Sequence, residues 1–576
     1  MKTGNYILML HSHLPWVMNH GQWPHGEDWL TEAAAESYIP LLNIFNDLLN
    51  EGIYAKITIG LSPVLCEQLA HPDFDKKFKD YCDAKIKSAS EDEEKFRKWG
   101  NDPQQVRLAK YWQKWYNDRK NNYIYNYSSS ILNAFKELQD KGAIEIATCG
   151  ATHGYLPLLG TEESIELQIR AAVENYKKHF GTSPRGIWLP ECAYRPSYEW
   201  HSMLPIDPFD KNRLRPGIEQ FLSRHGLNYF FTDQDLTDRS CKLGAFLDGN
   251  KHNFISADSP GFIPGKYLFE QMHGNVFNVS SSEKTEYGTA AVFTRHHEIA
   301  MQVWSGTIGY PGEPDYLDFH KKQYESYLRY WSVTDTKADM MYKQLYIPEH
   351  TEDKVDKQSN HFIHHIENTL YDYKNRSGRF GVLCTPFDTE LFGHWWFEGP
   401  EFLKHLLRGI HHSPYVDAAT ASERLENHPP EEVATLPEGS WGENNNHDVW
   451  SNKANEWTWR LIYDNENRWT KMMNEFMHSD ITSLMRRILT QALREMMLMH
   501  SSDWQFLIHN HSAADYAEQR LFFHNSDFNK LCDIAERVSS RLSLTREEEA
   551  YLDKTEKRDS VFSELQLEWW KKPETN

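Results

Sequence analysis

The sequence contains few cysteines, and their arrangement suggests no covalent or metal staple. There are seven in 576 residues, an odd number, widely spaced and without a Cys-x-x-Cys pair. This pattern argues against a disulfide framework and against a structural zinc site. A chain of this length can bury about two or three hydrophobic cores, so it needs no staple to fold. We expect the cysteines to be reduced thiols.

Long hydrophobic runs and an excess of positive charge are also missing. No stretch is apolar enough for a membrane span, and the apolar run near the N-terminus ends at Leu10, too short for a signal peptide. The 83 acidic residues outnumber the 62 basic ones, which gives a net charge of −21. Such a charge argues against nucleic acid or an anionic membrane as partner and suits a neutral polymer. We expect a cytoplasmic protein.

Aromatic residues, in contrast, are abundant. With 20 Trp, 29 Tyr and 29 Phe, the chain is 14% aromatic although it is otherwise polar. Several tryptophans stand among His, Asn, Gly and Glu instead of in apolar runs: Trp16, Trp23, Trp29, Trp395, Trp396, Trp441 and Trp450. Such residues suit platforms for the flat faces of sugar rings. Burial in the core of a large domain is the alternative for each of them.

Short β-rich runs alternate with longer helical patterns, which predicts parallel βα units. The runs cover residues 6–10, 54–59, 143–148, 186–189, 229–232, 300–304 and 380–384. Polar or aromatic residues follow at the carboxyl end of each run: His11, His13, Ser62, His153, Glu191, Asp233, Asp235, the segment at Trp304, and Asp388. In a closed α/β barrel these ends build one active site, whereas an open sheet gathers side chains only near its switch point. The pattern favours the barrel.

Three regions depart from this alternation. Residues 71–128 are charged and then aromatic, which predicts a helical insertion, and 236–298 lack periodicity, which predicts a long loop over the site. Beyond residue 413 helical patterns replace the strands. We therefore expect a catalytic barrel over residues 1–413, interrupted by the insertion at 71–128, and a C-terminal helical domain over 414–576.

Glu191 and Asp388 are the principal candidates for catalysis. Each stands where a strand-like run gives way to a loop rich in aromatic residues. Two carboxyl groups that flank a glycosidic bond are the usual machinery for cleaving it. The sequence thus predicts a site that cleaves sugars.

Longer motifs surround these carboxylates and carry a family resemblance. The runs are His11-Ser-His-Leu-Pro-Trp, Gly150-Ala-Thr-His-Gly-Tyr-Leu-Pro, Trp188-Leu-Pro-Glu-Cys-Ala-Tyr, Pro386-Phe-Asp-Thr-Glu-Leu-Phe-Gly-His-Trp-Trp and Glu456-Trp-Thr-Trp. In order and spacing they resemble the signature regions of glycoside hydrolase family 57. Two later runs, Leu436-Pro-Glu-Gly-Ser-Trp-Gly-Glu and Ser501-Ser-Asp-Trp, are similar to those of its 1,4-α-glucan branching enzymes. The resemblance covers nearly the whole chain.

The resemblance implies a fold and a mechanism. The fold would be a distorted (β/α)7 barrel with an inserted helical subdomain and a C-terminal all-helical domain. Glu191 would be the nucleophile and Asp388 the general acid of a retaining reaction, with carboxyl groups about 5–5.5 Å apart. Asp388 then needs a raised pKa, which an ionised Glu191 and a rim formed by Phe387, Trp395 and Trp396 could provide. Such a reaction needs no cofactor.

Three histidines, His11, His13 and His153, allow two interpretations. The family resemblance implies neutral imidazoles that donate hydrogen bonds to sugar hydroxyls beside the scissile bond. The alternative is a metal site, because His-x-His with a distant His and an Asp is typical of metal ligands. A metal-dependent polysaccharide deacetylase would use such a site. We favour the site without metal, because a covalent carboxylate mechanism needs none.

Branching also requires that water be excluded before the acceptor arrives. The resemblance assigns this to a loop tyrosine, for which we prefer Tyr267 with Tyr287 as competitor, and to the tryptophans that match acceptor-binding positions, Trp29, Trp304, Trp441 and Trp450. Trp504 would brace the cleft from the helical domain or pack in its core. The expected partner is an α-glucan such as amylose or glycogen, and the expected state is a monomer.

Two departures from the family pattern leave the activity open. Asp233-Gln-Asp235 stands where Asp-x-His is expected, and Glu443-Asn-Asn-Asn-His447 replaces a loop richer in glycine. We therefore keep an α-1,4-glucan hydrolase or 4-α-glucanotransferase of the same family as the alternative to a branching enzyme. A carbohydrate-binding protein with a decayed site is disfavoured because both carboxylates are present.

Overall fold

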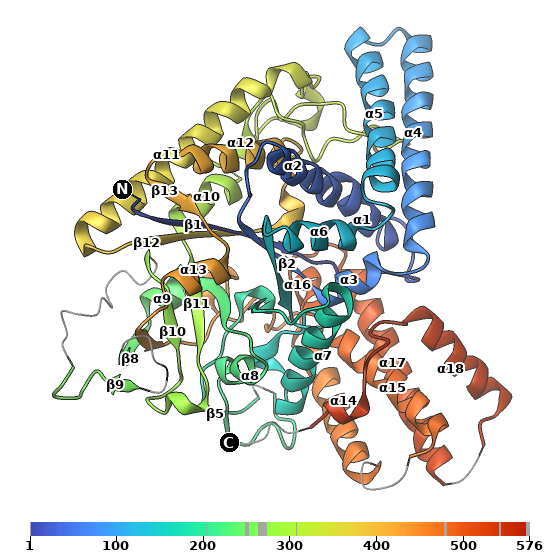
Figure 1. Ribbon diagram of the computed structural model, residues 1–576. Helices are drawn as coiled ribbons and strands as arrows, with labels where there is room; N and C mark the ends of the chain where they lie inside the picture. The colour runs from blue at the N-terminus through green and yellow to red at the C-terminus, as the bar shows by residue number, and fades with distance from the viewer. Residues whose placement is uncertain are drawn as a thin grey trace.

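The computed structural model describes residues 2–202, 204–247, 251, 253–262, 274–306, 308–476, 481–540 and 543–571. Seven of the described strands form a closed parallel barrel at the centre of the molecule (Figure 1). They are β1 (Gly4–Ser12), β2 (Ile57–Leu61), β3 (Ile144–Cys149), β4 (Gly186–Trp188), β7 (Tyr229–Asp233), β11 (Ala290–Arg295) and β12 (Gly381–Asp388). The pairing of β11 with β12, at Arg295 and Cys384, closes the ring. The predicted fold class is confirmed.

Side chains of the barrel strands alternate between an inner and an outer core. On β1, Ile7 and Met9 belong to the cluster inside the barrel, whereas Leu8 and Leu10 pack outward against helices. The same alternation holds on β12, where Val382 and Cys384 lie inside. Because side chains alternate with a period of two, the inner sets continue at the carboxyl end of the barrel to two predicted site residues, His11 on β1 and Asp388 on β12.

The range 71–128 contains two long antiparallel helices, α4 (Phe74–Trp99) and α5 (Pro103–Asn121), which project from the body of the molecule (Figure 1). Gly100 ends α4 in the left-handed conformation, at φ 68°, and the side chain of Asp102 caps α5 by accepting from the backbone N–H of Gln104. Trp112 anchors α5, because its buried indole donates to the carbonyl of Arg329 at 2.6 Å.

The C-terminal part is helical from α14 (Glu456–Phe476) onward. It continues with α15 (Ser483–Met499), α16 (Asp503–His509), α17 (Ala514–Ser539) and α18 (Arg546–Arg558). In Figure 1, α15, α17 and α18 lie together at the lower right, and α16 lies nearer the centre of the molecule. The link of the helical part to the barrel is direct: Gly154, after β3, pairs with Ser501, and the hydroxyl of Thr152 donates to the carbonyl of Met497 at 2.5 Å. The helical part therefore closes over the carboxyl end of β3.

Two sequence predictions about elements between residues 236 and 304 are wrong. Residues 300–304 are not a strand but the end of α10 (His297–Trp304), whose buried residues Ile299, Ala300 and Val303 follow a helical spacing. The sixth barrel strand is β11 instead. Residues 236–298 are not one loop, because they contain β8 (Cys241–Phe246), β9 (Phe254–Ser256), β10 (Phe277–Val279) and β11.

Strands also continue beyond residue 413. β13 (Val416–Ala418) pairs with β1, and β14 (Glu432–Thr435) pairs with β8 and β10. The prediction that strands end at 413 is therefore wrong. The division of the chain into domains stays a prediction, and these pairings favour a later start for its helical part.

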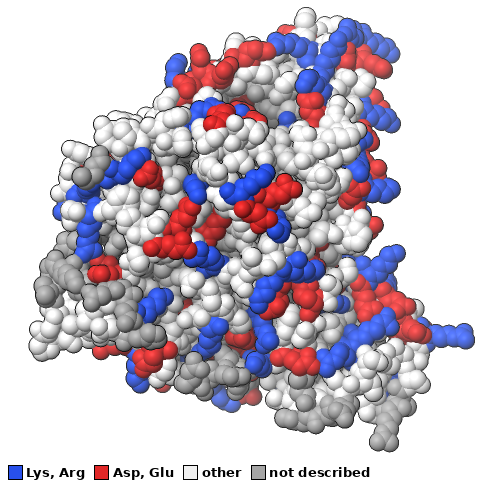
Figure 2. Space-filling model, in the orientation of Figure 1, with Lys and Arg blue, Asp and Glu red and all other residues white. Residues whose placement is uncertain are grey.

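No helix in the described ranges is both long and apolar enough to cross a membrane. On the face drawn in Figure 2, acidic and basic side chains are interspersed, and the visible described residues form no broad patch of one sign. The net negative charge is thus spread over this face.

Candidate active site

A cavity of about 770 Å³ lies at the carboxyl end of the barrel strands. Most of the predicted site residues line it together: His11, His13, Trp29, His153, Glu191, Trp304, Asp388, Trp395, Trp441 and Trp450. They come from loops after five barrel strands and from the segment that joins β14 to α14, in agreement with the location of active sites in α/β barrels. Its volume is sufficient for an oligosaccharide segment.

Of the other predicted residues, Tyr287 and Trp504 do not line this cavity. Tyr267 lies outside the described residues. Tyr287 is 43% exposed and is absent from the cavity wall. Trp504 is fully buried, and its indole donates to the carbonyl of Leu498 at 2.8 Å. The complete burial of Trp504 favours the packing alternative for this residue.

Several cavity residues were missed by the sequence analysis. Arg295 is the inward residue that ends β11, and it was overlooked because the sixth strand had been assigned to residues 300–304. Glu390 and Asp503 also line the cavity. Asp503 stands inside the Ser501-Ser-Asp-Trp run, where only the tryptophan had been considered. The inward parity of Phe293 and Arg295 is the signal that could have found the arginine.

Glu191 is held by hydrogen bonds on both carboxylate oxygens. Its Oε2 accepts from the indole Nε1 of Trp441 at 2.9 Å, and its Oε1 accepts from the hydroxyl of Ser502 at 2.8 Å. The backbone at Glu191 is in the left-handed region, at φ 62°, as is that of Cys192, at φ 50°. Such conformations are rare outside glycine and are tolerated where the surroundings fix them. The carboxylate is thus preoriented toward the cavity.

Burial raises the pKa of Glu191 to about 7. The hydrogen bond from Trp441 opposes this shift, the negative charge of Asp503 adds to it, and the hydroxyl of Ser502 again opposes it. The charge of Asp388 makes a smaller contribution that raises the pKa. The donors therefore keep the group ionisable near neutral pH although it is removed from water.

Asp388 is the last residue of β12 and is paired in register with His11. Burial raises its pKa to about 8, the charge of Glu390 raises it further, and Arg295 acts in the opposite direction. The predicted raised pKa is found, but the charge responsible is that of Glu390 and not that of Glu191. Near neutral pH, Asp388 mostly holds its proton while Glu191 is about half ionised, so the two pKa values are ordered as an acid and a nucleophile require.

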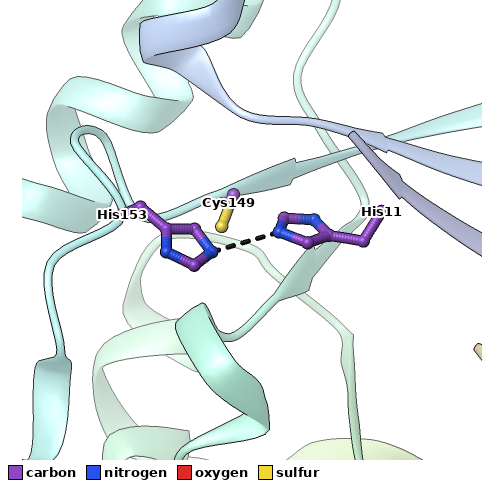
Figure 3. A group of neighbouring side chains, drawn as sticks. All are labelled: His11, Cys149 and His153. Carbon is purple, nitrogen blue, oxygen red and sulfur yellow. Dashed lines mark hydrogen bonds between the residues drawn. The ribbon is translucent and has the colours of Figure 1, made fainter. Parts of the chain in front are cut away.

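The three histidines form a stack beside Glu191. The rings of His13 and His153 lie 3.8 Å apart between centroids, and Nε2 of His11 is 3.1 Å from Nε2 of His153 (Figure 3). Burial lowers the pKa of His11 and that of His153 well below the ordinary value. Repulsion from His153 and His13 adds to the shift of His11, and repulsion from His13 adds to that of His153, which the charge of Asp503 opposes. Both imidazoles are therefore uncharged.

Two groups of side chains at this site have donor atoms close enough for a metal ion. One is His11, Cys149 and His153 (Figure 3), and the other is His13, His153 and Asp503. Burial raises the pKa of the Cys149 thiol well above its ordinary value, which disfavours the thiolate that a metal requires. Nε2 of His11 is hydrogen-bonded to Nε2 of His153, and Nε2 of His13 to the carboxylate of Asp503, so the imidazoles fit an internal network better than a metal centre.

Two family models match the chain. The model described as glycosyl hydrolase family 57 matches residues 7–437, which include the whole barrel and both catalytic candidates. The chain belongs to glycosyl hydrolase family 57. A second model, described as the C-terminal part of 1,4-alpha-glucan branching enzyme, matches residues 462–570.

Members of this family with known names and structures resemble the chain over nearly its full length. A 1,4-alpha-glucan branching enzyme of Thermococcus kodakarensis is 37% identical over 97% of this chain and 77% of its own length. The crystal structure of a family 57 branching enzyme from Pyrococcus horikoshii has a TM-score of 0.86 at 35% identity and covers 100% of this chain and 98% of its own. An alpha-amylase of Thermotoga maritima has a TM-score of 0.79 at 28% identity, with complete coverage of both chains.

The aromatic residues of this family 57 site form much of the cavity wall. Trp304 and Trp441 meet edge to face with centroids 6.2 Å apart, and Trp395 is 48% exposed. Trp450 is nearly buried and stacks on Tyr155 at 4.8 Å. An exposed ring such as Trp395 suits a platform for sugar rings, whereas Trp450 offers little accessible surface.

Of the two departures from the family pattern, one does not reach the cavity. Asp235 pairs with Arg239 on the short helix α9 (Gln234–Asp238), and Asp233 pairs with Arg295 below the cavity. Glu443, in the other departure, does line the cavity, while His447 bonds to Tyr155 and Glu438. Any change in acceptor binding is therefore expected from the segment around Glu443.

Proposed function

We propose that the protein is a 1,4-α-glucan branching enzyme that cleaves an α-1,4 linkage and transfers the released chain to a 6-hydroxyl of a glucan. One observation carries this proposal: Glu191 and Asp388, of which Glu191 has the lower pKa, face one aromatic cavity in a family 57 chain whose C-terminal part matches that of branching enzymes. The named relatives that cover nearly the whole chain support the same activity.

In the first step, the Glu191 carboxylate attacks the anomeric carbon while Asp388 gives its proton to the departing glycosidic oxygen. The carbon–oxygen bond of the linkage breaks, a glycosyl ester forms on Glu191, and the outgoing chain leaves with a new hydroxyl group. In the second step, the Asp388 carboxylate takes the proton of an acceptor 6-hydroxyl, whose oxygen displaces Glu191. Two inversions give net retention, and the carboxyl groups are expected about 5–5.5 Å apart.

The covalent intermediate must meet a sugar before it meets water. The tryptophans of the cavity wall, Trp29, Trp304, Trp395 and Trp441, would bind the acceptor and exclude water. For the covering tyrosine we retain Tyr267 as the proposal. The proposed function also includes contacts of His11, His13 and His153 with the substrate, because all three line the cavity.

A hydrolase is the second candidate, favoured by the likeness to the Thermotoga maritima alpha-amylase, which covers both chains completely. The same carboxylate pair would serve it, with water as the acceptor. The deciding experiment incubates the purified protein with amylose and quantifies α-1,6 linkages by proton NMR. We expect new branches with the wild type and none with Glu191→Gln or Asp388→Asn; shortened linear chains alone would contradict branching.

The remaining proposals concern partners and location. We propose an α-glucan such as amylose or glycogen as the substrate, a monomer that acts without a metal or other cofactor, and a cytoplasmic location. The uncharged nature of glucans agrees with the interspersed surface charge (Figure 2). A metal-dependent deacetylase would instead lose its activity to a chelator and keep it in Glu191→Gln.

A further inference from the structure

Ser502 joins the catalytic carboxylate to the histidine stack. Its hydroxyl donates to Glu191 Oε1 at 2.8 Å and lies 2.8 Å from Nδ1 of His153. The side chain is fully buried, and the backbone N–H of Ser502 donates to the carbonyl of His153 at 3.0 Å. Both the side chain and the backbone of Ser502 therefore fix its position between Glu191 and His153.

The chemistry of these groups determines the direction of every hydrogen bond. A hydroxyl has one hydrogen, and an ionised carboxylate can only accept, so the Ser502 hydrogen points to Glu191. Ser502 must then accept from His153, whose hydrogen is on Nδ1. Since this imidazole is uncharged, its Nε2 is an acceptor, and the hydrogen between the two rings belongs to Nε2 of His11.

An independent feature agrees with this order. Nδ1 of His11 is buried and has no hydrogen-bond partner in the described part of the chain. If His11 carried its hydrogen on Nδ1, a donor would be buried without an acceptor, which costs about 1–3 kcal/mol. With the hydrogen on Nε2, only a lone pair is left unpaired. Nδ1 of His11 is thus the last atom in the chain of hydrogen bonds, and it carries a lone pair and no hydrogen.

We propose that His11, His153 and Ser502 form an ordered relay of donors in which Ser502, from the helical C-terminal part, is a positioning residue for Glu191. The proposal rests on the proposed role of Glu191 as nucleophile. The relay holds Oε1 of Glu191 in the ionised state and in the glycosyl ester, because both accept a hydrogen bond. Two of the ring N–H groups expected to bind sugar are therefore engaged inside the protein.

The relay has a kinetic consequence that a packing role lacks. A donor to the carboxylate favours its charged form, so removing the donor raises the pKa of Glu191. The other groups that face Glu191 are the indole of Trp441, the charges of Asp503 and Asp388, and His153. Ser502→Ala replaces none of these groups, although it removes the acceptor of His153. The acid limb of the pH profile should move to higher pH, because Glu191 must be ionised to react.

The test compares the pH dependence of kcat/KM on amylose for the wild type, Ser502→Ala and Ser502→Thr, which keeps the hydroxyl. We expect the acid limb of Ser502→Ala to move up by about one pH unit, with about tenfold lower activity on that limb, and the threonine variant to restore its position. The matched control is Thr458→Ala, which removes another fully buried hydroxyl that accepts from Gln505 at 3.0 Å and touches no catalytic group. Its limb should coincide with that of the wild type.

Each outcome has one meaning. A Ser502→Ala limb that coincides with the wild type, with activity lowered equally at every pH, would overturn the relay. Turnover retained in Glu191→Gln would instead overturn the proposed function. Neutron diffraction gives a check that needs no activity: we expect deuterium on Nδ1 of His153 and on Nε2 of His11. Deuterium on Nε2 of His153 would overturn the proposal.

Discussion

Glu191 and Asp388 carry the same functional group, and their surroundings separate their roles. Glu191 accepts from Trp441 and Ser502, whereas Asp388 faces the negative charge of Glu390. Hydrogen-bond donors lower the pKa of a buried carboxyl group, and a like charge raises it. The pKa of Glu191 is therefore lower than that of Asp388, as a nucleophile and an acid require. Glu390 is itself buried, with a pKa raised to about 7, and accepts from the hydroxyl of Tyr38.

A prediction about pH follows at this scale. We expect kcat/KM to rise as Glu191 ionises through about 7 and to fall as Asp388 loses its proton through about 8. Glu390→Gln removes the charge that raises the pKa of Asp388, so its alkaline limb should move to lower pH, while Glu390→Asp should keep the limb in place. Initial rates on amylose across this range measure the effect, and an unmoved alkaline limb in the glutamine variant would contradict it.

At the scale of elements, the insertion depends on one buried ring. Trp112 on α5 is 1% exposed, donates to Arg329 and packs against Phe397 at 5.4 Å, and both partners lie outside the insertion. The indole therefore joins the α4–α5 pair to the rest of the molecule. Trp99, at the end of α4, is instead 66% exposed.

These two tryptophans make a matched pair for mutation. We expect Trp112→Ala to lower the free energy of unfolding by about 3–5 kcal/mol, through the lost burial and the cavity that remains. Trp99→Ala should change it by less than about 0.5 kcal/mol. Urea unfolding followed by circular dichroism compares them, and similar midpoints for both variants would show that Trp112 is not an anchor.

The sequence was most informative about elements with a clear period. Six barrel strands were located because each is a short apolar run followed by a polar residue, but 290–295 was missed in favour of the apolar helix that ends at Trp304. The contacts of Glu191 with Trp441 and Ser502 could not be predicted, since their spacing of 250 and 311 residues carries no local pattern. The burial of Trp504 could not be predicted either, because the sequence does not distinguish an aromatic residue in a core from one in a cleft.

At the scale of the whole molecule, buried carboxyls with raised pKa are numerous. Burial raises the pKa to about 8 for Asp388 and to about 7 for Glu191, Glu390, Glu398 and Glu466. Such groups bind protons more tightly in the folded state, so their contribution to stability is lost as pH rises from the unfolded pKa through the folded one. Glu36 and Glu67 have pKa values lowered to about 2 although burial opposes this, and their contribution is lost in acid.

We therefore expect the melting temperature to be highest near about pH 5 and to fall toward about pH 8. Asp388→Asn should melt about 1–3 °C above the wild type near pH 8 and equal it near about pH 2, where the aspartate is neutral in both states. Calorimetry at a series of pH values gives the comparison. A variant that is less stable than the wild type at pH 8 would contradict the argument.

The origin of the two donors to Glu191 has a consequence for how the enzyme is made. The carboxylate follows β4, yet its donors are at positions 441 and 502, on segments that leave the ribosome much later. Until then the barrel strands up to β12 can be present while the nucleophile lacks both contacts that orient it. A chain that ends before residue 441 therefore contains Glu191 and Asp388 but lacks both hydrogen-bond donors that orient Glu191. The ability to cleave a glucan is acquired only when the C-terminal part of the polypeptide has been made.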